Sequence, residues 1–205
     1  MTEPIHIALV DDDAAVLDSL RLYCARHHVT TSCFDSAEAL LADLDGGTLP
    51  ECIVSDIRMP GMSGLDLLHS LKERRVSAPL ILITAVVELA MAVSAIKKGA
   101  FDFIEKPFDE AHLLTSVQTA VQVRRQQARD EAEIEKLRSR FNALSARQRQ
   151  VMELAVAGLT SKEIANRLEI SYKTVEIHRA WLMERMGAKS LGELVRIAMK
   201  MEERP

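Results

Sequence analysis

The chain is poor in cysteine and in aromatic residues, and it lacks long apolar runs. Its three cysteines, Cys24, Cys33 and Cys52, do not have the spacing of metal ligands, so we expect buried, reduced thiols in a cytosolic protein. No apolar run approaches the roughly 20 residues of a membrane span. The first residues carry no basic segment. The sequence therefore predicts a cytoplasmic protein without a signal peptide or a membrane partner.

Charge is unevenly distributed along the 205 residues. Residues 1–122 carry 9 Lys and Arg against 18 Asp and Glu, a net of -9; residues 123–140 carry 6 against 4, or +2; residues 141–205 carry 11 against 8, or +3. An acidic first half suits cation binding, whereas the mildly basic last part permits nucleic-acid binding without requiring it. The length is sufficient for two small domains.

Short apolar runs alternate with helical patterns in the acidic half. The predicted strands cover residues 5–10, 29–34, 52–55, 80–84 and 101–105. Periodicity and capping predict helices at residues 16–24, 36–44, 65–71 and 88–98, and a fifth from residue 109. Five strands alternating with five helices predict an α/β fold, a doubly wound five-stranded parallel sheet. Right-handed crossovers would bring the loops after the first, third and fourth strands to one edge.

Five polar side chains at the predicted strand ends should converge on that edge. They are Asp11, Asp12, Asp56, Thr84 and Lys106. Each has an ordinary explanation alone: Asp56 could cap a loop or the helix that begins near Ser63, Thr84 could cap the end of its strand, and Lys106 could be a solvated surface charge. Together, the carboxylates repel one another unless a cation relieves them, and oxygen ligands suit magnesium. A neutralised carboxylate can attack a phosphoryl group, with Lys106 and Thr84 stabilising its oxygens. The cluster therefore predicts phosphoryl transfer to one of its carboxylates.

These motifs also carry a family resemblance, over about residues 4–122. The chain resembles the flavodoxin-like receiver domain of bacterial two-component response regulators at Val10-Asp11-Asp12-Asp13, Asp56 with Met59-Pro60-Gly61, Thr84-Ala85 and Lys106-Pro107-Phe108. It resembles the FixJ-type branch in particular at Ser63-Gly64, Met91-Ala92-Val93 and Lys98-Gly99-Ala100.

The resemblance implies roles for individual residues. A sensor histidine kinase would phosphorylate Asp56. The Mg²⁺ (or Mn²⁺) ligands would be Asp12, Asp56 and the Arg58 carbonyl, with Asp11 acting through water. Lys106 would neutralise the phosphoryl group and precede a cis peptide bond at Pro107. The receiver would catalyse only its own phosphorylation and dephosphorylation.

Thr84 and Phe103 would form the switch pair implied by the same resemblance. Its position in a strand alone favours a core role for Phe103, so its role in the switch rests mainly on the resemblance. Asp13 has two interpretations, an outer-shell acid or a helix cap, and we favour the cap. The loop Val86-Val87-Glu88-Leu89 departs from the polar sequence usual in this branch. Its two β-branched residues predict a stiffer loop and altered autodephosphorylation.

No glycine or proline occurs between Phe108 and Ala157, so this connector is either one long helix or two helices with a break. After a polar run, apolar residues recur at three- and four-residue steps, at Ile134, Leu137, Phe141 and Leu144. This spacing fits a short coiled-coil seam between two chains. It also fits docking onto the C-terminal domain, which we favour because two heptads are marginal.

The basic last part predicts four short helices with a helix-turn-helix in the middle. Caps at Ser145, at Thr160 or Ser161, and at Ser171 mark helix starts, and Glu169-Ile170-Ser171 forms the turn. We expect Trp181 in the core. The third helix presents a polar face that fits the DNA major groove, although any amphipathic helix has such a face.

Residues 142–200 resemble the LuxR-type output domain, and this resemblance favours DNA binding. It rests on Leu144-Ser145, Arg149-Gln150-Val151, Gly158-Leu159-Thr160, Lys162-Glu163-Ile164-Ala165, Ile170-Ser171, Thr174-Val175 and His178. Phosphate contacts are expected from Thr160, Ser161, Lys162 and Ser171. The recognition helix would contribute Lys173, Thr174, Glu176, Ile177, His178 and Arg179. His178 is either a phosphate contact or a buried, hydrogen-bonded imidazole.

The resulting prediction is a transcription regulator with a receiver at 1–122, a helical linker at 123–141 and a DNA-binding domain at 142–205. Phosphorylation would drive homodimerisation on promoter DNA, where RNA polymerase is a further expected partner. One rival is an aspartyl-phosphate phosphatase, but Ile57-Arg58 after Asp56 supplies no second acid. Another is an adaptor that drains phosphate from a kinase and whose C-terminal domain is silent.

Overall fold

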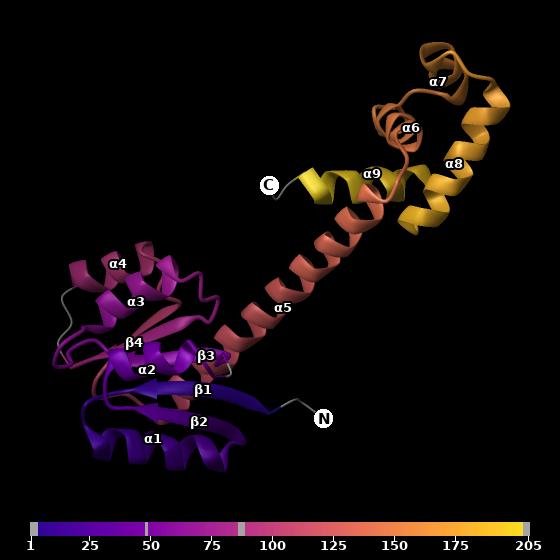
Figure 1. Ribbon diagram of the computed structural model, residues 1–205. Helices are drawn as coiled ribbons and strands as arrows, with labels where there is room; N and C mark the ends of the chain where they lie inside the picture. Colours follow the sequence, from indigo (N-terminus) through magenta and orange to yellow (C-terminus); the bar gives the residue numbers. More distant parts are fainter. Residues whose placement is uncertain (1–3, 48, 86–88, 203–205) are drawn as a thin grey trace. The chain divides into compact units, whose positions relative to one another are not determined.

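A five-stranded parallel sheet organises the first part of the chain. The computed structural model describes residues 4–47, 49–85 and 89–202. The strands lie in the order β2-β1-β3-β4-β5 (Figure 1). Their bounds are β1 Ile5–Val10, β2 Val29–Phe34, β3 Cys52–Asp56, β4 Leu80–Thr84 and β5 Asp102–Glu105. The chain moves outward from β1 in both directions, so the predicted doubly wound sheet is confirmed.

Helices cover both faces of this sheet. They are α1 Ala14–Arg26, α2 Ala37–Leu44, α3 Gly64–Glu73, α4 Leu89–Lys97 and α5 Glu110–Asn142. Side chains alternate along each strand, so Ala8 and Val10 join a core under α2, α3 and α4, while Ile7 and Leu9 join a core under α1 and α5 (Figure 1). The predicted loop at Val86-Val87-Glu88 lies outside the described residues.

The cysteines divide by position within this layering. Cys24 on α1 and Cys52 on β3 are buried, as expected, but Cys33 is exposed. The prediction of three buried thiols was therefore wrong for Cys33. It lies on β2, which is an edge strand of the sheet. Burial raises the pKa of the Cys24 thiol to about 11 and that of Cys52 to about 12.

The connector is one helix within the described part of the chain. α5 runs continuously from Glu110 to Asn142, which decides between the two alternatives left by the sequence. The chain forms two compact units, residues 1–127 and 128–205, and the division falls inside α5. No helix of the described residues is both long and apolar enough to cross a membrane.

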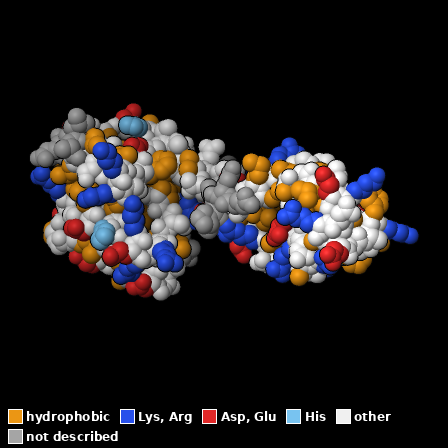
Figure 2. Space-filling view, turned by 90° about the horizontal axis from the view of Figure 1, so that it is seen from above, with side chains coloured by type: hydrophobic (Ala, Val, Ile, Leu, Met, Phe, Trp, Pro, Cys, Tyr) orange, Lys and Arg blue, Asp and Glu red, His pale blue; other side chains and the backbone are white. Residues whose placement is uncertain are grey.

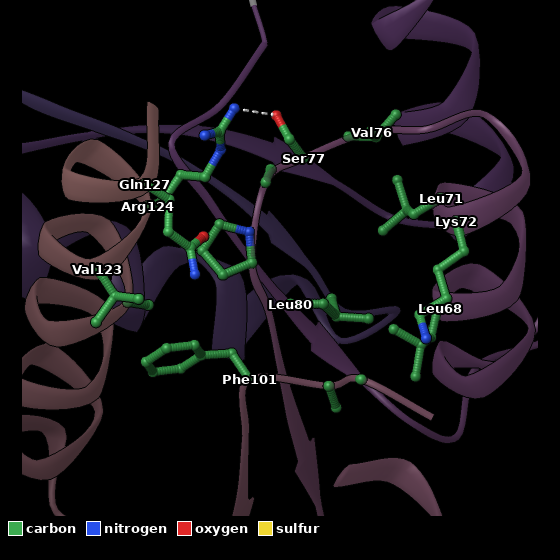
Figure 3. Close-up of a pocket in the computed structure, with 15 residues that line it drawn as sticks. Leu68, Leu71, Lys72, Val76, Ser77, Leu80, Phe101, Val123, Arg124 and Gln127 are labelled. Atoms are coloured by element: carbon green, nitrogen blue, oxygen red, sulfur yellow. Dashed lines mark hydrogen bonds between the residues drawn. The ribbon is translucent and has the colours of Figure 1, made fainter. Parts of the chain in front are cut away.

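Within the first unit, α5 is tied to the segments that enter β3 and β4. Arg125 donates to both carboxylate oxygens of Glu51 at 2.6 and 2.9 Å, and Arg124 donates to the Ser77 hydroxyl at 2.6 Å (Figure 3). A cavity of about 380 Å³ opens beside this second contact, at the amino ends of β4 and β5. Lys72 and Phe101 are among its lining residues, and none of the predicted site residues lines it.

The second unit is helical, as predicted, and has its own core. Its helices after α5 are α6 Ala146–Val156, α7 Ser161–Leu168, α8 Tyr172–Met186 and α9 Leu191–Glu202. Ser145, Thr160 and Ser171 each accept a backbone hydrogen bond and cap α6, α7 and α8, which confirms the predicted starts. On the face seen in Figure 2, basic and acidic side chains are interspersed rather than gathered by sign.

The last turns of α5 dock within this unit. Ile134 and Leu137 are buried, and Leu144 belongs to the core of the unit. Two polar contacts lie beside them: Lys200 forms an ion pair with Glu133 at 2.6 Å, and Arg138 donates to the Met201 carbonyl at 3.2 Å. These contacts agree with docking of the apolar stripe onto the C-terminal helices rather than with an open seam.

Candidate functional site

Strand register brings the predicted site residues to one edge. Val10 pairs with Ser55, so the residues that follow them lie at neighbouring positions: Asp11 just after the end of β1, and Asp56 as the last residue of β3. Asp56 pairs in turn with Ile83, one residue before Thr84. All of these positions are at the carboxyl ends of parallel strands, where such sheets bind their ligands.

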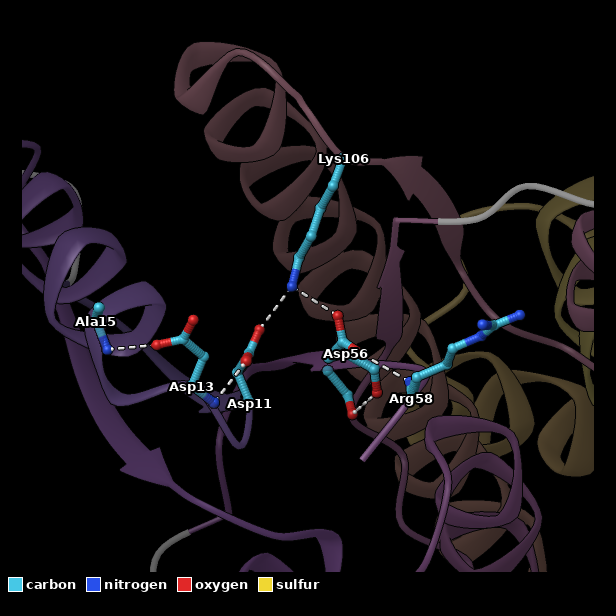
Figure 4. A network of polar contacts seen from close by, with 7 residues as sticks. Asp11, Asp13, Ala15, Asp56, Arg58 and Lys106 are labelled. Atoms are coloured by element: carbon cyan, nitrogen blue, oxygen red, sulfur yellow. Dashed lines mark hydrogen bonds and ion pairs between the residues drawn. The ribbon is translucent and has the colours of Figure 1, made fainter. Parts of the chain in front are cut away.

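Lys106 joins the two buried carboxylates. Its ammonium donates to Asp56 Oδ1 at 2.6 Å and to Asp11 Oδ2 at 2.9 Å (Figure 4). The lysine reaches this position from the end of β5, where its backbone N–H donates to the Thr84 carbonyl at 2.7 Å. The Lys106–Pro107 bond is cis, as predicted. Three segments far apart in the sequence thus meet around one positive charge.

The surroundings keep Lys106 charged. Burial opposes the charge, but the hydrogen bonds to Asp56 and Asp11, with their negative charges, outweigh it and raise the pKa of the ammonium above its ordinary value. The Asp11 and Asp56 residues are only 5% and 7% exposed. One cation between two carboxylates leaves an excess of one negative charge in a poorly solvated place.

Backbone donors orient the remaining carboxylate oxygens. The N–H of Arg58 donates to Asp56 Oδ2 at 2.7 Å, and the N–H of Asp13 donates to Asp11 Oδ1 at 2.9 Å (Figure 4). Asp13 itself caps α1 by accepting from the Ala15 N–H at 2.8 Å, which confirms the favoured interpretation. Both carboxylates are therefore held in defined orientations before any ligand arrives.

The other predicted receiver residues lie around this network. Asp12 is exposed in the loop after β1. Thr84 is buried at the end of β4, with 1% of its surface exposed. Phe103 on β5 is half-buried and packs against the core under α2, α3 and α4. This position agrees with the core interpretation and leaves the switch role a prediction.

The donor set fits a hard divalent cation. Two oriented carboxylates, an exposed third and a backbone carbonyl supply only oxygen, which magnesium and manganese accept. The local excess of negative charge favours such an ion. No cluster of three or more His, Cys, Asp or Glu suited to a metal occurs among the described residues, so the side-chain ligands alone do not form a closed cage.

Gly64 lies next to the site. In the sequence it was only part of a motif shared with the FixJ-type branch, whereas the structure shows why a glycine is needed there. A Cβ on Gly64 would lie 2.5 Å from the Asp56 carbonyl oxygen and 3.0 Å from Ile57 Cα. α3 therefore begins directly against the chain that leaves β3, and Ser63 caps it. This packing role could not be recognised from composition, because the close approach joins a helix start to a strand end.

The predicted DNA contacts cluster on α7 and α8 but differ in availability. Those exposed are Thr160, Lys162, Ser171, Lys173, Glu176 and Ile177, and those half-buried are Ser161, Thr174, His178 and Arg179. The Thr160 hydroxyl is engaged with Glu163, and Ser171 caps α8. Arg179 donates to the Ser161 hydroxyl at 3.2 Å, which ties α8 to the start of α7. Several of these side chains thus stabilise the helix-turn-helix itself.

Two aromatic residues of α8 can be compared with the predictions, and one of those predictions was wrong. Trp181 is 58% exposed, so its placement in the core was wrong. The helix turns Val175, Leu182 and Met186 inward instead, and Trp181 falls on the opposite side. His178 is half-buried, and its Nδ1 atom has no hydrogen-bond partner within the described ranges. The alternative of a hydrogen-bonded buried imidazole is not supported at that nitrogen.

The fold and the strand-end cluster define a receiver-type signalling protein with a helix-turn-helix output unit. Residues 7–118 match the response regulator receiver domain, and residues 142–198 match the bacterial regulatory proteins of the luxR family. The chain belongs to the two-component response regulators with a LuxR-type output domain, which are transcription regulators rather than conventional enzymes.

Similar proteins cover nearly the whole chain. The transcriptional regulatory protein FixJ of Bradyrhizobium diazoefficiens is 41% identical over 98% of this chain and 97% of its own. The response regulator protein TmoT of Ectopseudomonas mendocina is 38% identical over 96% of this chain and 89% of its own. The solved structure of the response regulator StyR superposes with a TM-score of 0.83 at 32% identity, over 97% of this chain and all of that one.

Proposed function

We propose that Asp56 accepts a phosphoryl group from a sensor histidine kinase and that this event controls DNA binding by the C-terminal unit. The observation that carries the proposal is the position of Asp56. Its carboxylate is nearly buried at a strand end, with one oxygen at the Lys106 ammonium and the other at the Arg58 N–H. A carboxylate held this way is oriented for attack and stays neutralised until the phosphoryl group arrives.

A divalent cation, Mg²⁺ or Mn²⁺, would be held by Asp12, Asp56 and the Arg58 carbonyl, with Asp11 acting through water. When bound, it supplies charge neutralisation for the incoming phosphoryl oxygens. The protein supplies the rest: Asp56 is the nucleophile, Lys106 compensates an oxygen of the phosphoryl group, and the Thr84 hydroxyl donates to another.

Phosphorylation adds about 1.5 to 2 negative charges at neutral pH. We propose that Thr84 moves towards this charge and that Phe103 turns inward behind it. The altered surface of α4, β5 and α5 then favours a homodimer. Dimerisation pairs two DNA-binding units on a two-fold promoter site, where RNA polymerase is the further partner. This activity belongs in the cytoplasm, where the kinase domain and the DNA are accessible.

The proposed division of labour follows the predicted boundaries. Residues 1–122 receive the phosphoryl group, residues 123–141 connect, and residues 142–205 bind DNA. Phosphate contacts would come from the start of α7 and the turn, and base contacts from Lys173, Glu176 and Arg179 on α8.

The test combines phosphorylation with footprinting on the full chain. The purified protein is incubated with acetyl phosphate and Mg²⁺, and phosphoryl transfer is read by intact mass. The parent and an Asp18→Asn control should gain one phosphoryl group, and Asp56→Asn should gain none. Genomic footprinting before and after phosphorylation should then show increased occupancy that Lys173→Ala and Arg179→Ala reduce.

Two results would contradict the proposal. If Asp56→Asn were phosphorylated as well as the parent, Asp56 would not be the phosphoacceptor. DNA occupancy independent of phosphorylation, or unaffected by the substitutions on α8, would favour the rival adaptor in which the receiver only drains phosphate from a kinase.

A further inference from the structure

The exposed side of α8 carries two large apolar side chains that the fold does not use. Ile177 is 49% exposed and Trp181 is 58% exposed, and they lie one helical turn apart. Trp181 is the only tryptophan of the chain. Within the described part of the chain, its indole N–H has no hydrogen-bond acceptor. The opposite side of the helix already fills the core, so these two side chains contribute little to folding.

The helix that carries them is the second helix of the helix-turn-helix. Lys173 lies one further turn towards its amino end and is also exposed, so Lys173, Ile177 and Trp181 follow one another along one side. At a rise of 1.5 Å per residue, Trp181 is about 12 Å from Lys173 along the axis, and Ile177 is halfway. The major groove is itself about 12 Å wide.

Because of this spacing, Ile177 and Trp181 would lie at different depths in the major groove. If the amino end of α8 enters the groove, Ile177 lies among the base edges, where the thymine methyl is the apolar group available. Trp181 then lies where the sugar-phosphate backbone borders the groove. An indole offers that border a flat apolar face for a deoxyribose and an N–H donor for a phosphate oxygen.

We propose that Trp181 is a DNA-contacting residue that packs on the sugar-phosphate backbone, and that Ile177 beside it contacts a thymine methyl group. The inference rests on the proposed function and deepens it. Trp181 would increase the affinity for DNA of any sequence, and Ile177 would contribute to discrimination between DNA sequences.

Charge around the pair favours DNA as the occupant over a second copy of the chain. Charged residues are depleted at the centre of protein–protein interfaces. Here Lys173 is exposed on the same side of α8, and the α8 amino terminus contributes a positive partial charge. The residues from 141 to 205 carry 11 basic against 8 acidic side chains, a net of +3.

The experiment uses the phosphorylated full chain and two duplexes, one selected from a random pool by the parent protein and one of random sequence. Trp181→Ala should bind both duplexes about 10-fold more weakly, as for the loss of a buried interface aromatic. Trp181→Phe keeps a ring and should recover part of this loss. Ile177→Ala should reduce the ratio between the two duplexes by about 5-fold or more and affect random DNA little.

The fluorescence of Trp181 provides a direct test of its contact with DNA. Addition of DNA to the parent should shift the indole emission and reduce quenching by acrylamide. Met199→Ala is the matched control, because Met199 is 55% exposed on α9 of the same unit and should leave both affinities unchanged. Thermal unfolding of each variant distinguishes lost contacts from lost folding.

Lys173→Ala separates this contact from a charge effect. It should lower the salt dependence of binding by about one ion, whereas Trp181→Ala should leave that slope unchanged, because a neutral N–H releases no counterion.

Parent-like DNA affinity of Trp181→Ala would overturn the inference while leaving the proposed function intact. A change in oligomeric mass without a change in DNA affinity would assign the pair to an interface between copies. A parent that enriches no sequence from the random pool and does not bind random DNA would overturn the DNA-binding function as well.

Discussion

Lys106 carries the charge balance of the strand-end site. It is the group that faces both Asp11 and Asp56, and its raised pKa keeps it protonated throughout the neutral range. Its stabilising effect is complete below the unfolded lysine pKa of about 10.4 and is lost as the pH rises through the higher folded value. At neutral pH it therefore stabilises the fold as well as the proposed phosphoryl group.

Removal of this charge should expose the repulsion between the carboxylates. We expect Lys106→Met to lower the free energy of unfolding by about 2–4 kcal/mol at pH 7, because two poorly solvated anions lose their cation. Added MgCl₂ should raise the unfolding midpoint more in this variant than in the parent, since a divalent ion restores the missing charge. Calorimetry measures both effects, with exposed Lys97→Met as control. Equal magnesium effects in all three proteins would contradict a cation site here.

The cysteines differ in chemistry because they differ in burial. Thiolates react and thiols do not, so the pKa values of about 11 for Cys24 and about 12 for Cys52 predict inert side chains, whereas Cys33 is exposed. At pH 8 iodoacetamide should modify Cys33 alone, and the buried pair only in denaturant. Peptide mass spectrometry reads the sites, with Cys33→Ser as control. The protonated thiols of Cys24 and Cys52 contribute to the stability of the fold fully below about pH 8.5, and this contribution is lost as the pH rises through their folded pKa values. Rapid native labelling of Cys52 would contradict this assignment.

At the level of whole elements, α5 depends on a long-range pair. The Arg125 hydrogen bonds hold the pKa of the Glu51 carboxyl below its usual range, so this pair stabilises the fold above the unfolded pKa of about 4.3 and is lost as the pH falls through the folded value. Because both side chains are more than a quarter exposed, Glu51→Gln should cost only about 1 kcal/mol at pH 7. The difference from the parent should shrink as the pH falls below the unfolded glutamate pKa of about 4.3 and through the lower folded value.

Denaturant unfolding at several pH values measures this dependence. Asp45→Asn is the matched control, because the Asp45 side chain is 70% exposed in its pair with Arg74 and should contribute less. A Glu51→Gln effect that stays constant as the pH falls from 7 to well below the unfolded glutamate pKa of about 4.3 would assign the loss to packing rather than to the ionised pair.

The sequence predicted local elements better than partners across the fold. Strand ends, the sheet and the caps at Asp13, Ser145 and Ser171 follow from patterns a few residues long, and the structure has them. The Glu51–Arg125 pair joins positions 74 residues apart, and no local pattern specifies it. The exposure of Trp181 was not predicted, because large aromatic side chains are buried on average. Which residues of α8 face solvent depends on which side of the helix packs against the core.

The candidate site was predictable for a related reason. Parallel strands place their carboxyl ends together whatever the side chains are, so topology alone brings Asp11, Asp56 and Lys106 to one edge. Their hydrogen bonds to one another depend on register, which periodicity does not give. The close approach of Gly64 to Asp56 depends on how α3 packs against the end of β3. The sequence therefore indicated this glycine only through a family motif and did not predict the contact.

On the scale of the whole chain, burial is divided between the two units. The two cores around the sheet draw on residues up to Val121, and the helical core on residues from Phe141 onward. Each unit therefore buries its own apolar side chains, and α5 is the covalent element they share. Stability should belong to each unit separately, whereas control of DNA binding by phosphorylation should belong to the intact chain.

Separate expression of residues 1–127 and 128–205 tests this division. The first fragment should take up a phosphoryl group from acetyl phosphate at the rate of the full chain, since it keeps Asp11, Asp56 and Lys106. The second should fold cooperatively and bind DNA with an affinity that phosphorylation of added first fragment does not change, because two unlinked units cannot exert intramolecular control. Mass spectrometry, calorimetry and DNA titration read these outcomes against the full chain. Unfolded fragments would show instead that the units stabilise each other, and phosphorylation-dependent binding by the mixture would locate the control in association rather than in α5.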